Sequence, residues 1–107
     1  MAYSHFDQIM ALRNLRVSRE GSELSRITVY TATIDPTEVA ANSISAQTFA
    51  VTGLSTADTV IVNPGTNVIG IGAVRVTAAN TLEVTFINPT ATAIDPPSST
   101  WKIIAIE

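Results

Sequence analysis

Short runs rich in Val, Ile and Thr fill the chain from about Gln47 to the C-terminus, and residues such as Gly, Pro and Asn separate them. A similar run, in which Ile27, Val29 and Thr31 lie on one face, precedes them. This period-two alternation predicts β-strands, and the turn residues recur at a spacing of roughly ten. The predicted strands are 26–33, 47–52, 58–62, 72–77, 81–87 and 100–106. The pattern therefore predicts an all-β fold, either an antiparallel β-sandwich or a small β-barrel.

A hairpin between residues 72–77 and 82–87 is the clearest local element. Asn80 lies in its short connection, and asparagine tolerates the left-handed backbone conformation that a tight turn requires. We expect four side chains of this hairpin to face the core: Val74, Val76, Val84 and Phe86.

The final strand carries apolar side chains on both of its faces. Trp101, Ile103 and Ala105 fall on one side, and Ile104 and Ile106 fall on the other. A strand that is apolar on both faces is typical of one that is covered twice. We therefore expect the second face of this strand to lie against another subunit.

The first 25 residues differ from the rest and form a predicted N-terminal arm (1–25) ahead of a β-sandwich body (26–107). The arm region is free of Pro, and four of its residues follow helical spacing: Phe6, Ile9, Met10 and Arg13. Leu15 and Val17 instead alternate with polar residues as in a strand. A helix of about two turns is marginal in water unless it docks on something. The arm is thus either a strand paired to the body or a segment that orders on a partner. Four of the six basic residues lie within the arm or at its boundary: Arg13, Arg16, Arg19 and Arg26.

Composition narrows the function classes. The 107 residues fit one domain, and 46% are hydrophobic whereas only 6% are aromatic and 14% are charged. The net charge of -3 gives no general attraction to a phosphate backbone, so we expect no nucleic-acid binding. We expect no membrane span and no export through a signal peptide, because no window approaches about 20 uninterrupted apolar residues and the N-terminus lacks a basic region followed by an apolar one. The absence of cysteine excludes disulfides and thiolate chemistry.

Residues that most catalysis needs are sparse. His5 is the single histidine, and the nine acidic residues are scattered without the spacing of a calcium loop. Gly70 and Gly72 resemble the start of a phosphate loop, but a strand follows them, so a bulge or a tight entry into the strand is the better interpretation. Trp101 and Phe86 are candidates for stacking on a sugar, although core packing is favoured for both. We predict that the protein is not an enzyme and has no metal or cofactor site.

Four turn patterns in residues 40–107 carry a family resemblance. They are a Thr-Gly-Leu turn (52–54), a Val-Asn-Pro strand end (62–64), an Asn-Thr-Leu hairpin (80–82) and an Asn-Pro-Thr exit (88–90). With the final strand, this region resembles a small β-domain of tailed-bacteriophage virion proteins, particularly capsid decoration (cement) proteins. The resemblance implies a homo-oligomer, a dimer or trimer, that binds major capsid protein subunits on the outer surface of an icosahedral head after synthesis in the bacterial cytoplasm.

The leading hypothesis is therefore a cement protein whose arm fastens it to the shell through many weak contacts. The arm residues expected to make these contacts are Phe6, Ile9, Met10, Leu12, Arg13 and Arg16. One alternative is a carbohydrate-binding or receptor-binding module of a head or tail fibre, which would use the loops 63–69 and 88–99. Another is a tail structural protein that forms rings.

Overall fold

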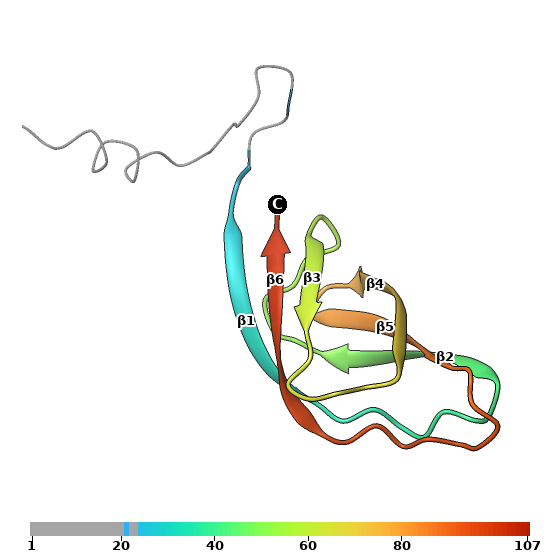
Figure 1. Cartoon of the computed structure of the whole chain (residues 1–107). Helices are drawn as coiled ribbons and strands as arrows, with labels where there is room; N and C mark the ends of the chain where they lie inside the picture. The colour runs from blue at the N-terminus through green and yellow to red at the C-terminus, as the bar shows by residue number, and fades with distance from the viewer. Residues whose placement is uncertain (1–20, 22–23) are drawn as a thin grey trace, which may run out of the picture.

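The computed structural model describes Gly21 and residues 24–107, and this part of the chain is all-β (Figure 1). It contains six antiparallel strands and no helix. The strands are β1 (Ile27–Ile34), β2 (Ser43–Ala50), β3 (Thr59–Asn63), β4 (Gly70–Ala78), β5 (Thr81–Asn88) and β6 (Ser99–Ile106).

The strands form two three-stranded sheets, ordered β1-β6-β3 and β2-β5-β4. In Figure 1, β1, β6 and β3 lie roughly along one axis, antiparallel to their neighbours, and β2 and β5 lie across that axis. Both sheets contribute side chains to one core. The predicted antiparallel β-sandwich is therefore confirmed, with the strands of the two sheets crossing.

Strand positions agree with the sequence pattern except at β2, which begins at Ser43 rather than at Gln47. Apart from Ile44, the extra residues are serine and alanine, which have a weak strand signal. These residues extend β2 because they pair with β5: Ile44 pairs with Ile87, and Ser45 pairs with Phe86. Long-range pairing thus extended this strand beyond its local signal.

The core lies between the sheets and contains the expected large residues. Trp101 of β6 and Phe86 of β5 are fully buried, with ring centroids 6.2 Å apart in an edge-to-face arrangement. Phe49 of β2 approaches Phe86 in the same way at 6.3 Å. Ile103 and Ala105 are also fully buried. The predicted inward side of the final strand is therefore confirmed.

A β-bulge at the two glycines of β4 keeps that strand's apolar residues on the inner face. The register moves from Ile71↔Phe86 to Val74↔Val84, so β4 advances three residues while β5 advances two. In a regular strand, residues three positions apart such as Ile71 and Val74 would lie on opposite faces, and the bulge places them on the same one. The structure confirms the bulge, and it confirms the left-handed turn residue of the hairpin, because Asn80 has a φ of 62°.

One buried amide holds the two long connections, residues 35–42 and 89–98, against each other. Asn88 at the end of β5 donates hydrogen bonds to the carbonyl oxygens of Val39 (3.1 Å) and Thr92 (2.9 Å). Val39 also pairs with the other connection in an isolated antiparallel bridge. The loops at this end of the sandwich are therefore tied to the sheets by a satisfied buried polar group.

Candidate interaction surface

The outer face of the β1-β6-β3 sheet is rich in exposed aliphatic side chains. Ile27 is 57% exposed, Val29 is 59% exposed and Ile61 is 56% exposed. Ile104 and Ile106 of the central strand are half-buried on the same side. We call these five residues the aliphatic face: Ile27, Val29, Ile61, Ile104 and Ile106.

Strand register makes the aliphatic face continuous. Ile104 pairs with Val29 on one side and with Ile61 on the other, which gives one row of three aliphatic residues across the sheet. Ile106 pairs with Ile27 in the next row. Directly opposed side chains on one face of a sheet have Cβ atoms about 4.5–5.5 Å apart, so the residues of each row touch.

The rest of the described chain leaves the aliphatic face open to solvent. Its residues come from both edge strands and the central strand, and so they gather although 79 positions separate Ile27 from Ile106. Isolated exposed apolar residues are ordinary, whereas contiguous ones mark an interaction surface. The face is therefore the best candidate for a functional surface in the described structure.

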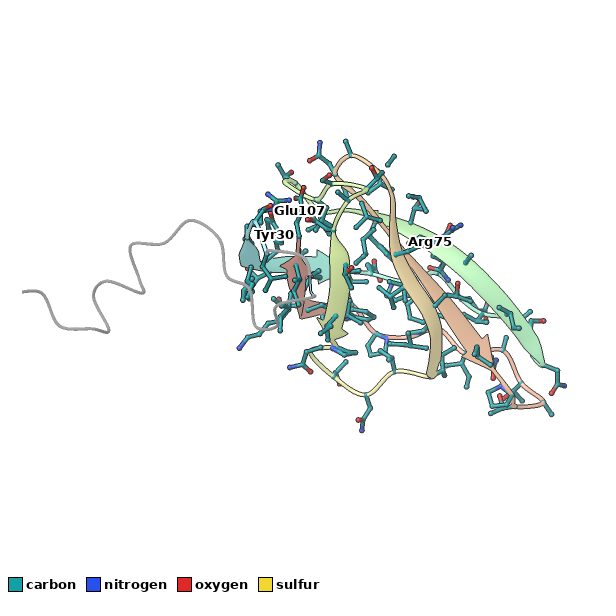
Figure 2. All side chains as sticks on the ribbon, turned by 90° about the horizontal axis from the view of Figure 1, so that it is seen from above. Tyr30, Arg75 and Glu107 are labelled. Carbon is teal, nitrogen blue, oxygen red and sulfur yellow. The ribbon has the colours of Figure 1, made fainter. Side chains whose placement is uncertain are left out.

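An ion-pair cluster borders the aliphatic face where the chain enters β1. Arg26 Nη2 lies 3.0 Å and 2.9 Å from the two carboxylate oxygens of Asp58, and Arg26 Nε lies 3.1 Å from Glu107 Oε2. Figure 2 shows Glu107 and Tyr30 at the side of the sandwich formed by the β1-β6-β3 sheet, and Arg75 on the other sheet. The cluster therefore joins the start of β1, the turn before β3 and the end of β6.

Burial and hydrogen bonding act in opposite directions on Asp58. Its carboxylate is completely buried, and burial alone would raise its pKa. The Ser55 N–H (2.9 Å) and the Arg26 guanidinium donate to the carboxylate and outweigh burial, so the pKa of Asp58 lies below its ordinary value. The hydrogen bond to Asp58 likewise raises the pKa of Arg26. Asp58 is thus held as a charged structural group.

A turn at Gly53 completes this corner of the molecule. Gly53 has a φ of 106°, its N–H donates to Asn80 Oδ1 (2.8 Å), and its carbonyl oxygen accepts a hydrogen bond from Tyr30 Oη (3.2 Å). A Cβ at this position would lie 2.8 Å from Tyr30 Cε1. These contacts hold β1 against the hairpin turn, so their role is structural.

Two shallow depressions lie on the surface of the described structure. One polar depression is formed by the loop 63–68, and another lies beside Ile44 and Ile87 on the other sheet. Trp101 and Phe86 are fully buried, so neither can stack on a sugar. Among Gly21 and residues 24–107, no three His, Cys, Asp or Glu side chains are grouped to hold a metal ion.

The predicted contact residues of the arm lie outside the described residues, as does His5; the contact residues are Phe6, Ile9, Met10, Leu12, Arg13 and Arg16. The sequence pattern predicts a second apolar face on the final strand, with Ile104 and Ile106. The pattern does not predict that Ile27, Val29 and Ile61 share this face, because alternation within a strand does not say which side is buried or which strands are neighbours.

Comparison with known proteins found no matching family model and no match among curated proteins or solved structures. Within the described residues there is no helix long and apolar enough to cross a membrane.

Proposed function

We propose that this protein is a structural virion protein, a capsid decoration or cement protein that binds the outside of an icosahedral head and bridges neighbouring major capsid subunits. The aliphatic face is the observation that carries the proposal. It is an exposed, contiguous apolar surface of the kind that other proteins bind, and it lies on a small β-sandwich with a well-packed core. The resemblance of residues 40–107 to small β-domains of phage virion proteins supports the same proposal.

The size of the aliphatic face favours a multivalent mechanism. Fully burying an aliphatic side chain gains about 1.5–3 kcal/mol, and Ile27, Val29 and Ile61 are already partly buried. Association costs an estimated 4–15 kcal/mol in lost freedom of motion, so one such face binds weakly. Several linked copies that bind together convert weak contacts into strong attachment. A homo-oligomer that spans adjacent capsid subunits would then oppose their separation.

The proposal is tested by co-sedimentation of the purified protein with empty phage heads that lack it, followed by electron microscopy. We expect saturable binding in an icosahedral array. Ile61→Lys, which places a charge in the row that Ile61 forms with Ile104 and Val29 on the aliphatic face, should abolish binding. Thr48→Lys places the same charge at an exposed position of β2 on the other sheet and should leave binding intact.

Absence of binding to heads, or equal loss of binding in both variants, would contradict the proposal. Rings of the purified protein in the micrographs would favour a tail structural protein instead. A carbohydrate-binding module is less well supported, because the two aromatic residues considered for sugar stacking are enclosed in the core.

A further inference from the structure

The N-terminal segment joins the body directly beside the aliphatic face. The backbone N–H groups of Ser25 and Arg26 both donate to the carbonyl oxygen of Glu107, and Glu107 N–H donates to the carbonyl oxygen of Arg26 at 3.0 Å. The next residue along the sheet is Ile27, which pairs with Ile106 in the first row of the face. Residues 1–23 are therefore tethered at the edge of the exposed apolar patch.

The aliphatic face is too small to hold a second folded copy by itself. Three strands spaced by about 4.8 Å are about 14 Å wide, and the two rows occupy about 14 Å along the strands. The projected area is on the order of 200 Å², whereas a stable interface buries about 800 Å² per partner. Two turns of an α-helix, about 11 Å long and about 10 Å across, match the face closely.

The tethered segment contains a stretch of that size. Phe6, Ile9 and Met10 follow the i, i+3, i+4 spacing that places side chains on one stripe of a helix, and Arg13 at i+7 ends this stripe with a charge. Thirteen positions separate Arg13 from Arg26, and at about 3.3 Å per extended residue this linker can reach every part of the face. A short tether also gives a millimolar effective concentration, which favours the segment of the same chain over that of another copy.

We propose that residues 6–13 form an amphipathic helical segment that packs Phe6, Ile9 and Met10 on the aliphatic face of their own chain. Each part supplies what the other lacks. A two-turn helix is marginal in water without a surface to dock on, and the face is apolar without a cover among the described residues. This inference goes beyond the proposed function and holds whether or not the protein binds a capsid. In a protein that does bind one, the segment and the shell would compete for the same face.

Paramagnetic NMR of the full chain tests this inference. The chain has no cysteine, so a nitroxide attached to Ala11→Cys, opposite the apolar stripe, labels one position. We expect the methyl signals of Ile61 and Ile104 to lose most of their intensity, and those of Ile44 and Ile87 on the other sheet to be broadened far less. Adding the substitutions F6S, I9S and M10S should remove the broadening, whereas adding Q8S on the polar side should preserve it.

A mixed sample identifies the occupant. It contains isotope-labelled protein without nitroxide and nitroxide-labelled protein without isotope, in equal amounts. Unbroadened methyl signals in the mixture, together with broadening in the singly labelled sample, support docking within one chain. Strong broadening in the mixture would overturn the inference in favour of exchange between copies. The absence of selective broadening in either sample would overturn docking on this face.

Discussion

The two sheets of the sandwich are alike on their inner faces and different on their outer faces. Leu82 and Val84 of one sheet and Ile103 of the other are all fully buried. Outside, the β1-β6-β3 sheet presents the aliphatic face. The other sheet presents mainly threonine and alanine, with the pair Arg75–Glu83 at 3.1 Å. Closing the sandwich requires only the inner faces to be apolar. The outer difference therefore reflects what each sheet meets after folding.

Large exposed aliphatic residues on the second sheet are confined to one end. Ile44 is 69% exposed and pairs with Ile87, which is 36% exposed. Beyond this pair, Thr85 and Ala46 face each other on the same side. The second sheet thus has an isolated aliphatic pair, whereas the first has a continuous five-residue patch.

We expect the largest losses of stability from substitutions on the inner faces, and we expect similar losses for the two sheets. Trp101→Ala and Phe86→Ala should each lower the free energy of unfolding by about 3–5 kcal/mol, because each leaves a cavity in the shared core. Urea denaturation followed by circular dichroism measures the change. Ile44→Ala, at an exposed position, is the matched control and should cost far less. An equal loss in the control would contradict the assignment of inner and outer faces.

Two glycines, one beside each sheet, allow a clash with the backbone to be compared with a contact to a flexible side chain. Gly65→Ala, in the loop after β3, would drive its new methyl group into the backbone carbonyl of Thr100 and should cost about 1–3 kcal/mol. Gly72→Ala, in the bulge of β4, meets the flexible end of Ile87 at 3.3 Å and should change stability by no more than about 1 kcal/mol. Thermal unfolding of both variants provides the measurement. Similar melting temperatures would refute the close packing of the loop on β6.

The ion pairs of the two sheets should differ in strength and in pH dependence. Asp58→Asn removes a buried carboxylate that accepts several hydrogen bonds and should cost about 1–3 kcal/mol at neutral pH. Glu83→Gln breaks a pair whose Arg75 side chain is 69% exposed, and it should cost about 0–1 kcal/mol.

The sign of the pH effect follows from the lowered pKa of Asp58. Its contribution is fully present above the ordinary pKa of aspartate, about 3.9, and is lost as the pH falls through the lower pKa of the folded state. Urea titrations at several pH values should show a smaller loss of stability on acidification in Asp58→Asn than in the parent. An unchanged pH profile would argue against this role of Asp58.

Local sequence patterns were enough to predict an all-β fold, the approximate strands, the turn at Asn80 and the core position of Trp101, and they offered a bulge as one of two explanations for Gly72. These features depend on local backbone preferences and on alternation within a strand, which a single stretch of chain contains. The arm contacts predicted for residues such as Phe6 and Arg13 stay predictions, since they lie outside the described residues.

The order of the strands and the side of each strand that faces out became known from the packed structure and could not be read from the sequence. Ile27 and Ile106 come together because β1 pairs with β6, and Arg26 reaches Asp58 because β3 lies on the other side of β6. Alternation gives two faces to every strand but does not label the inner one. The aliphatic face exists only once the pairing and the core have fixed that choice, because burial is a property of the packed sheets.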